Sequence, residues 1–341
     1  MKYVRLGPTG TKVSQFALGA WHLPGSGVRD QWGVETVDRQ EMAKIVKKAF
    51  DAGINFVDTA NVYHGRMQSS NPKHAGNSEK VLGQVLKGYD RDSLVLATKV
   101  RGALASWPNG EGLSRKHILW QARESLERLQ TDYIDLYQIH WPDPDTPKIE
   151  TLRALNHLVD EGRVRYIGSS NHSAAENEEF MQGARDHGLE GFATLQELYN
   201  LLERGFERNT LPVARKYGFS VLAYSPIAQG VLSGKYLGGV RKGTRASYAK
   251  DISKNYFNKG TEEAVSGLRE MAAQKGVTLP QLALAWLLHK QEDLGISIIP
   301  LLGVTSAKYL EDSLGSLDVK LTSDEMRQAE QMAGNANVLP W

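Results

Sequence analysis

Hydrophobic residues in this chain gather in short apolar runs, and a helical segment that ends at a glycine precedes most of these runs. Glycine takes without strain the left-handed backbone conformation that ends many helices. The glycines in this position are Gly53, Gly88, Gly162, Gly188 and Gly218. The pattern predicts helices and strands that alternate along the chain, which is typical of an α/β fold.

The apolar runs do not alternate with polar residues, so we expect each strand to be buried on both faces, as in a parallel sheet covered by helices. The eight predicted strands are Phe16–Gly19, Asn55–Asp58, Leu94–Lys99, Tyr133–His140, Val164–Ser169, Ala193–Gln196, Ser220–Tyr224 and Ile296–Leu302. Eight strands in 341 residues favour a closed (β/α)8 TIM barrel over an open doubly wound sheet. In addition, the Gly-x-Gly-x-x-Gly motif of the open sheet does not follow the first strand.

The ends of the predicted elements carry further signals. Tyr3–Leu6 and Val13–Phe16 flank a Gly-Pro-Thr-Gly turn and predict an N-terminal β-hairpin. Four helix starts carry N-cap residues, three with capping-box spacing: Asp38 with Glu41, Ser173 with Glu176, Thr322 with Glu325, and Ser114 alone. Leu237–Lys259 reads as a long loop after the seventh strand. No interdomain linker is apparent, so we expect residues 1–341 to form a single barrel domain.

Composition narrows the class of protein. Hydrophobic residues make up 41% and charged residues 23% of the chain, as in ordinary globular proteins. The 41 Lys and Arg nearly balance the 39 Asp and Glu, so neither nucleic acid nor a membrane surface is the expected partner. The absence of cysteine excludes disulfides, thiolate catalysis and cysteine-bound metals, and we expect no metal site. Neither a signal-peptide core nor a run of about 18 apolar residues is present, so we expect a cytoplasmic protein.

Polar residues stand at the C-terminal ends of the predicted strands, where functional sites of this barrel gather. These positions hold Trp21, Asp58, Lys99, His140, Asn171, Gln196 and Ser225, and the turn 303–305 follows the eighth strand. Taken singly, Asp58 is explained as a turn cap, Lys99 as a solvated charge and His140 as a core histidine. Together, and with Tyr63 following Asp58 by five positions, they predict a catalytic site.

These side chains suit the delivery of a proton to a carbonyl oxygen. A free tyrosine titrates near pH 10, so we expect an ammonium at Lys99 to lower the pKa of Tyr63 and Asp58 to orient that ammonium. His140 would fix the carbonyl oxygen beside the phenol. Since no side chain delivers hydride, reduction requires a nicotinamide or a similar cofactor.

The loops after the seventh and eighth strands are the usual phosphate site of the barrel. Ala223–Tyr236 supplies the hydroxyl of Ser225, two glycines and Lys235, and Arg245 follows. Gly303–Ser306 then opens a helix whose N-terminus attracts anions. Lys235 alone is better explained as a surface charge, so the prediction of a phosphate site rests on the whole set.

The same segments resemble the aldo-keto reductase superfamily over nearly the whole chain. The likeness is carried by Gly53–Ala60 with Tyr63, Ala97–Lys99, Arg128–Leu136 with Gln138–His140, and Ala223–Tyr236. The resemblance implies a catalytic tetrad of Asp58, Tyr63, Lys99 and His140, with Tyr63 as general acid and NADPH as hydride donor. It also implies that an aldehyde or ketone is reduced to an alcohol.

Within the superfamily the chain is most similar to the branch of potassium-channel β-subunits and their bacterial reductase relatives. The residues concerned are Gly112–Ile118, Pro142–Pro147, Thr244–Ser247 and Thr278–Ala283. The cofactor contacts implied by this similarity are Trp21, Asp58, Ser170, Asn171, Gln196, Tyr224, Ser225, Pro226, Ile227, Gln229, Lys235, Arg245, Gly303, Thr305, Tyr309, Asp312 and Ser313.

The chain departs from its relatives at three places. Where the helix after strand eight often carries basic residues and ends in Glu-Asn, this chain has Ser306, Tyr309, Asp312 and Ser313. Fewer charged side chains would then contact the 2′-phosphate of NADPH, so Arg245 becomes more important for binding it. NADPH remains favoured over NADH. The channel β-subunits have asparagine in place of His140, which favours an active reductase here. The loop His64–Asn77, which borders the substrate mouth, is longer than is usual in the family. The substrate of this chain can therefore not be deduced from the substrates of its relatives.

Two other functions remain open. A cofactor-sensing regulatory subunit would bind the nucleotide without turnover, and a Schiff-base aldolase would use Lys99 as its nucleophile. For a reductase, Trp21, Trp107, Trp141 and Tyr63 predict an aromatic pocket for a small-molecule carbonyl substrate. The sequence leaves room for a homo-oligomer.

Overall fold

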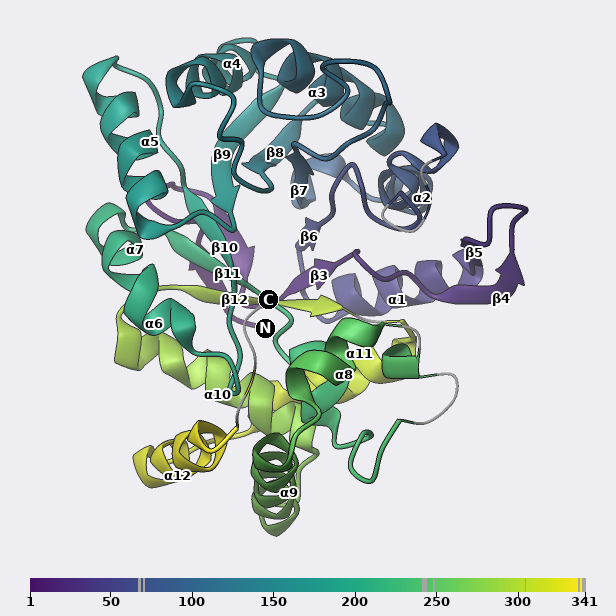
Figure 1. Ribbon diagram of the computed structural model, residues 1–341, viewed down its shortest axis with the longest axis vertical. Helices are drawn as coiled ribbons and strands as arrows, with labels where there is room; N and C mark the ends of the chain where they lie inside the picture. Colours follow the sequence, from purple (N-terminus) through teal and green to yellow (C-terminus); the bar gives the residue numbers. More distant parts are fainter. Residues whose placement is uncertain are drawn as a thin grey trace.

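Eight parallel strands close into a barrel, and helices surround it (Figure 1). The computed structural model describes residues 1–66, 69, 71–240, 244–247, 249–303, 305–336 and 338. In barrel order the strands are β10 (Thr194–Leu198), β11 (Ser220–Tyr224), β12 (Ile298–Gly303), β3 (Ala17–Gly19), β6 (Phe56–Asp58), β7 (Val95–Val100), β8 (Ile134–Ile139) and β9 (Val164–Ser170). The predicted (β/α)8 barrel is confirmed, with strand limits that differ from the predicted ones by a few residues at most.

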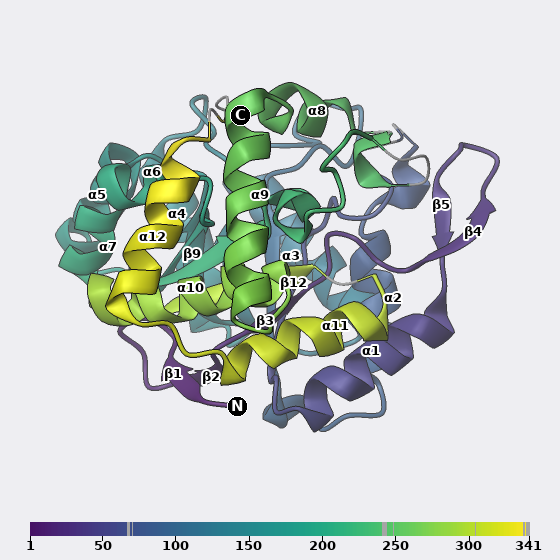
Figure 2. The same cartoon turned by 90° about the horizontal axis from the view of Figure 1, so that it is seen from below.

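The helices lie around the barrel and cover the outer face of its strands (Figures 1 and 2). They are α1 (Arg39–Asp51), α2 (Asn77–Leu86), α3 (Arg115–Leu129), α4 (Lys148–Asp160), α5 (Ala174–Asp186), α6 (Gly205–Asn209), α7 (Leu211–Tyr217), α8 (Lys250–Tyr256), α9 (Lys259–Gln274), α10 (Leu279–Leu294), α11 (Ala307–Leu314) and α12 (Ser323–Gly334). Among the described residues no helix has the length and hydropathy needed to span a membrane.

The predicted helix starts are largely confirmed. Full capping boxes form at Ser173 of α5 and Thr322 of α12, and Ser114 caps α3. Asp38 caps α1, but its predicted box is only half formed. The Glu41 carboxylate instead accepts a hydrogen bond from the backbone of Ala307, at 2.8 Å, because α11 packs against α1.

The predicted helix ends are right at four of the five glycines. Gly53, Gly162, Gly188 and Gly218 have φ angles of 86°, 70°, 63° and 69°. Gly88 is not among the glycines with positive φ, so that prediction is wrong. Helix α2 ends in a right-handed residue, Lys87, and a further turn joins the amide of Tyr89 to the carbonyl of Leu86.

The N-terminal hairpin closes one end of the barrel. Strands β1 (Tyr3–Arg5) and β2 (Lys12–Ser14) pair antiparallel, as predicted. Leu6 and Val13 are fully buried and join the cluster of apolar side chains inside the barrel. Figure 2 shows this hairpin and α8 at opposite ends of the molecule. The catalytic end predicted from the sequence is therefore the end near α8.

Two parts of the chain differ from the sequence prediction. A second hairpin, β4 (Gly25–Arg29) with β5 (Glu35–Val37), projects from the body and was not expected (Figures 1 and 2). The stretch 237–259 is not only a loop, because it contains a short 3-10 turn at Arg245–Ser247 and helix α8. Helix α8 forms there because its side chains Ile252 and Tyr256 are buried in the core. Residues 241–243 and 248 of this stretch lie outside the described residues.

Candidate active site

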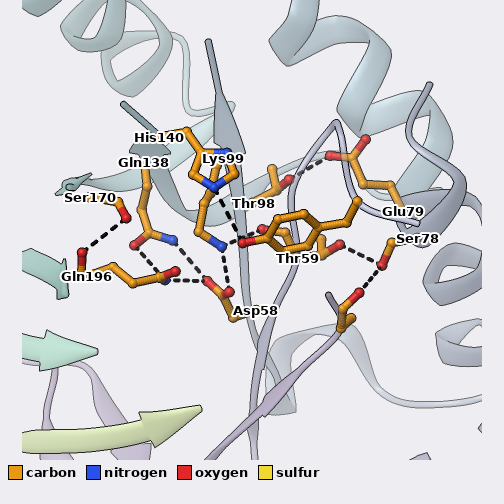
Figure 3. Close-up of polar contacts among 12 residues, drawn as sticks. Asp58, Thr59, Ser78, Glu79, Thr98, Lys99, Gln138, His140, Ser170 and Gln196 are labelled. Atoms are coloured by element: carbon orange, nitrogen blue, oxygen red, sulfur yellow. Dashed lines mark hydrogen bonds and ion pairs between the residues drawn. The ribbon is translucent and has the colours of Figure 1, made fainter. Parts of the chain in front are cut away.

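The last residue of β6 and a residue of the neighbouring strand β7 form a buried ion pair at the barrel mouth. The Nζ of Lys99 lies 2.5 Å from Oδ1 of Asp58 and donates a second bond of 2.9 Å to the carbonyl of Thr59 (Figure 3). The side chains of Lys99 and Asp58 are 0% and 2% exposed. Two charges this deeply buried persist only when they are paired and hydrogen-bonded, as they are here.

The second oxygen of Asp58 receives two amide donors from across the barrel. Nε2 of Gln138, on β8, and Nε2 of Gln196, on β10, each lie 3.0 Å from Asp58 Oδ2 (Figure 3). Gln196 also lies 3.2 Å from Oε1 of Gln138. Hydrogen bonds from amides favour the ionised carboxylate. Gln138 was part of the recognised motif, but sequence reasoning gave it no role.

Tyr63 and His140 meet beside this pair. The Tyr63 hydroxyl lies 3.4 Å from Nε2 of His140, and the Nζ of Lys99 lies 4.7 Å from the centroid of the Tyr63 ring. The imidazole stacks on Trp141, with ring centroids 3.7 Å apart, and its Nδ1 is buried without a partner in the described part of the chain. The structure thus brings together the four residues predicted as a tetrad.

The protonation of these groups is governed first by burial. Burial, and then the charge of Asp58, raise the pKa of Tyr63 well above its ordinary value. Burial, Lys99 and Arg101 hold the pKa of His140 well below its ordinary value. Burial also lowers the pKa of Lys99, and the Asp58 carboxylate opposes that effect. The pKa of Tyr63 is therefore raised and not lowered as expected, because burial and the charge of Asp58 both favour the protonated phenol.

Residues of β9, β10 and β11, together with Asn171 directly after β9, lie next to one another at the adjoining side of the mouth. The side-chain amide of Asn171 donates a hydrogen bond of 2.9 Å to the carbonyl of His140. Its oxygen accepts a hydrogen bond of 2.8 Å from the hydroxyl of Tyr224. Asn171 has a positive φ of 60°, which orients its amide across the mouth. Ser170 Oγ donates 3.0 Å to the carbonyl of Gln196. These four predicted cofactor residues therefore lie together beside His140.

The loop after β11 has an unusual backbone. Ser225, Ala228, Gln229 and Gly230 all have positive φ, between 47° and 92°. Non-glycine residues rarely take this conformation, and it concentrates at ligand sites. Pro226 and Ile227 lie within the same turn, and Ile227 packs on the core. The predicted phosphate loop is therefore locally strained.

Two cations gather near that loop. Lys235 lies against the loop, since an added Cβ at Gly230 would meet its Nζ at 2.8 Å. Burial, with the charge of Arg245, lowers the pKa of Lys235. Arg245 also lies over the ring of Trp21, with its Cζ 4.7 Å from the ring centroid. Trp21 in turn lies 6.2 Å, between ring centroids, from Tyr63. Arg245 thus reaches across the mouth from the β11 side to the end of β3.

The cofactor contacts predicted after the eighth strand are less concentrated. The space beside Gly303 is open, because an added Cβ would meet no heavy atom within 4 Å. Thr305 and Tyr309 are exposed, and Ser313 donates 2.9 Å to the carbonyl of Tyr309. Asp312 accepts from Thr278 Oγ1 at 3.0 Å and from Gln281 Nε2 at 3.1 Å. Its carboxylate is therefore engaged at the start of α10. Val304, in the predicted turn, lies outside the described residues.

The long loop predicted at 64–77 contacts the β4–β5 hairpin, which was not expected from the sequence. His64 Nε2 lies 2.9 Å from the carbonyl of Glu35, and His74 Nε2 lies 2.7 Å from Asp30 Oδ2. Pro72–His74 forms a 3-10 turn, and α2 begins at Asn77. Met67, Gln68 and Ser70 lie outside the described residues. The hairpin therefore supports the segment that follows Tyr63.

Comparison with known proteins agrees with this geometry. The sequence model of the Aldo/keto reductase family matches residues 15–333. The chain belongs to this family. It is 32% identical to a putative aryl-alcohol dehydrogenase of Schizosaccharomyces pombe, over 96% of this chain and 95% of the relative. It is 35% identical to a probable voltage-gated potassium channel subunit beta of Oryza sativa subsp. japonica, over 94% and 92%. It is also 35% identical to a putative voltage-gated potassium channel subunit beta of S. pombe, over 96% and 92%.

Membership makes this aldo/keto reductase an oxidoreductase of a family that uses NAD(P)H. The site fits a dinucleotide, because the loop after β11 has the positive φ angles that are common at ligand sites, Gly303 borders open space, and Lys235 and Arg245 supply positive charge. In the described part of the chain, no cluster of three or more His, Asp or Glu side chains is arranged to hold a metal ion.

Proposed function

We propose that this aldo/keto reductase reduces an aldehyde or ketone to an alcohol at the expense of NADPH, with Tyr63 as general acid. The observation that supports this most directly is the 3.4 Å contact between the Tyr63 hydroxyl and Nε2 of His140 at the mouth of the barrel. One carbonyl oxygen placed between these two groups can accept a hydrogen bond from each.

The four residues then have distinct roles. His140 stays neutral because its pKa is depressed, so its imidazole orients the carbonyl oxygen without competing as an acid. Tyr63 stays protonated until charge develops on that oxygen, and then transfers its phenolic proton to it. Lys99, 4.7 Å from the ring centroid, stabilises the phenolate that results. Asp58 holds the ammonium in place.

When bound, the nicotinamide supplies the hydride. We propose that Asn171, Gln196 and Tyr224 hold its ring beside Tyr63, and that Lys235 and Arg245 bind its phosphates. Two cations near the strained loop favour the additional 2′-phosphate of NADPH over NADH. Asp312 is a weaker candidate for a cofactor contact than expected, because its carboxylate is engaged by Thr278 and Gln281.

Aromatic carbonyl compounds are the substrates that the mouth favours. Trp21, Trp120 and Trp141 are partly buried and pack against the apolar cluster that contains Tyr63. Trp107, which was expected in this pocket, is 57% exposed and contacts Trp120 instead, 5.7 Å away between ring centroids. The name of the S. pombe relative, a putative aryl-alcohol dehydrogenase, supports the same substrate class.

The decisive variant is Tyr63→Phe, which removes the proton and leaves the ring. We expect kcat for benzaldehyde reduction to fall roughly 100- to 10,000-fold. NADPH binding, measured by fluorescence titration, should stay within about threefold of wild type, and an NADH titration on the same samples gives the nucleotide preference. Near-normal kcat in a variant that still binds NADPH would show that Tyr63 is not the acid.

Two relatives are named as potassium-channel β-subunits, which favours a cofactor-sensing regulatory subunit as the second candidate. Tight NADPH binding without turnover on a broad panel of aldehydes and ketones would support it over a reductase. A Schiff-base aldolase is disfavoured, because Lys99 is held as an ammonium by Asp58 and the carbonyl of Thr59. Borohydride trapping of a substrate on Lys99 would reverse that judgement.

A further inference from the structure

Arg101 lies beside the catalytic histidine at the barrel mouth. It follows the last residue of β7, and in the parallel pairing of β7 with β8 Val100 is opposite Ile139. The backbone amide of His140 donates 3.0 Å to the carbonyl of Val100. Arg101 and His140 are therefore neighbours at the ends of adjacent strands, and the charge of Arg101 contributes to the low pKa of the imidazole.

The backbone of Arg101 is held in a costly conformation. Its φ is 122°, a region that L residues with a side chain rarely enter. Its carbonyl accepts a hydrogen bond of 2.9 Å from the amide of Gly112, which helps to fix the turn. Strain of this kind concentrates at active sites and ligand clamps. A glycine would relieve the strain, so the presence of arginine points to a use for the side chain.

The guanidinium has a donor with no acceptor. Its Nε is buried and finds no hydrogen-bond partner in the described part of the chain. Nη1 lies 3.7 Å from Oε2 of Glu111, whose side chain is 61% exposed, so that pair is weak and screened by solvent. Buried donors in native proteins almost always have a partner, so the acceptor at this position is expected to come from a ligand or from water.

Two carboxylates on this side of the mouth, Asp58 and Asp143, are already engaged. Asp58 is paired with Lys99. The carboxylate of Asp143 accepts hydrogen bonds from the backbone amide of Leu113, at 2.6 Å, and from the hydroxyl of Thr146, at 2.7 Å. Within the described residues neither carboxylate forms an ion pair with Arg101 at 4 Å or less. The positive charge of Arg101 at this edge of the mouth is therefore only partly compensated.

We propose that Arg101 binds an anionic group of the substrate, so that the preferred substrate is a carbonyl compound that carries a carboxylate. This inference rests on the proposed reductase function. The carbonyl oxygen lies between Tyr63 and His140, and the carboxylate lies on the β7 side of the mouth. Guanidinium groups bind carboxylates with two parallel N–H donors, and the guanidinium of Arg101, on a side chain that is 29% exposed, has only a weak, solvent-screened partner in Glu111.

The test compares 4-carboxybenzaldehyde with its neutral methyl ester, methyl 4-formylbenzoate, as substrates of the NADPH-loaded enzyme. We expect wild type to prefer the carboxylate by at least roughly tenfold in kcat/KM, since a charged hydrogen bond is worth that much. Arg101→Gln and Arg101→Gly should lower kcat/KM for the carboxylate roughly 10- to 100-fold, and leave the ester within about threefold. The glycine variant relieves the backbone strain, so misfolding cannot explain a loss confined to the carboxylate.

Arg123→Gln serves as the matched control, because Arg123 is an exposed arginine of α3 and its side chain is 59% exposed. It should leave both substrates unchanged. Equal kcat/KM for the two aldehydes in wild type, or an unchanged preference in the Arg101 variants, would overturn the anion subsite while leaving the reductase function intact. Failure of wild type to reduce either aldehyde would overturn the proposed function instead.

Discussion

The amide of Gln138 donates a 3.0 Å hydrogen bond to the carboxylate of Asp58. Both side chains are buried, and Asp58 is the group that holds Lys99 in place. Gln138 is 0% exposed, and its distance to Asp58 leaves no room for an intervening water. We infer that Gln138 positions Asp58 and keeps it ionised. Because Asp58 in turn holds Lys99 beside the ring of Tyr63, Gln138 acts on Tyr63 indirectly, through Asp58 and Lys99.

Two substitutions at Gln138 test this inference. Gln138→Met removes the donor and should lower kcat roughly tenfold with little change in KM, because one hydrogen bond to a charged group is lost. Gln138→Glu should be active only at low pH. There the protonated carboxyl still donates to Asp58, whereas at higher pH a second negative charge beside Asp58 disturbs the pairing with Lys99.

The measurement is kcat for benzaldehyde reduction between pH 5 and 9. The exposed residue Gln328 of α12 supplies the control, since Gln328→Glu should leave the profile unchanged. A profile of Gln138→Glu that runs parallel to wild type over this range would contradict a positioning role.

His22 makes the stability of the protein depend on pH. Burial, then Arg245 and His64, lower the pKa of His22 to about 3. The unfolded chain, in which histidine titrates near pH 6.5, therefore binds one proton more than the folded chain between about pH 3 and 6.5. Stability is lost as the pH falls through this window, at up to about 1.4 kcal/mol per pH unit.

Urea unfolding at pH 7.5 and 5.0 checks this prediction in wild type and His22→Gln. Wild type should lose about 2 kcal/mol more than the variant between the two pH values. The comparison cancels the contribution of the other buried histidines, which are common to both proteins. Equal losses would mean that His22 is solvated, and protonated, in the folded state.

The barrel was predictable because its signal is local. Each strand is a short run that is apolar on both faces, and most of the helices between them end at glycines that take a positive φ. The β4–β5 hairpin had no such signal. It contains Gly25–Arg29, whose residues are all exposed, and its strands pair only with each other. A strand whose side chains are all exposed, such as β4, leaves no hydrophobic pattern in the sequence.

The site, like the fold, has features that the sequence predicts and features that it does not. Asp58, Lys99 and His140 stand at or next to strand ends, so the barrel architecture alone predicts that they converge. The role of Gln138 was missed because it depends on contacts across the barrel, between β6, β8 and β10. The direction of the pKa shift of Tyr63 was also missed, because it depends on the depth of burial, which a sequence pattern does not measure.

The raised pKa of Tyr63 has a consequence for the pH profile of the reaction. Burial and the charge of Asp58 keep the phenol protonated above its ordinary pKa of 10. The depressed pKa of His140 keeps the imidazole neutral well below pH 6.5. We therefore expect kcat/KM for a neutral aldehyde to stay within about threefold from pH 6.5 to 9.5. A fall of kcat/KM on the basic side of the profile, with a midpoint at pH 7 to 8, would show that the ammonium of Lys99 lowers the pKa of Tyr63 after all.

A second buried ion pair lies behind the site and is expected to contribute to the stability of the protein. Arg128 Nε lies 2.6 Å from Oε2 of Glu79, whose other oxygen accepts 2.6 Å from the hydroxyl of Thr98, the residue before Lys99. Glu79 is 0% exposed, so Arg128→Met leaves a buried carboxylate without its cation. That change should lower the free energy of unfolding by about 3–5 kcal/mol.

The double variant Arg128→Met with Glu79→Gln separates charge from packing. It should recover much of the lost stability, because removing both charges also removes the cost of burying an unpaired one. Urea unfolding at pH 7.5 gives both values, and removal of the exposed pair Lys47–Asp51 in the same way should leave the unfolding midpoint nearly unchanged. A single variant as stable as wild type would mean that Thr98 and solvent are enough to stabilise the Glu79 carboxylate.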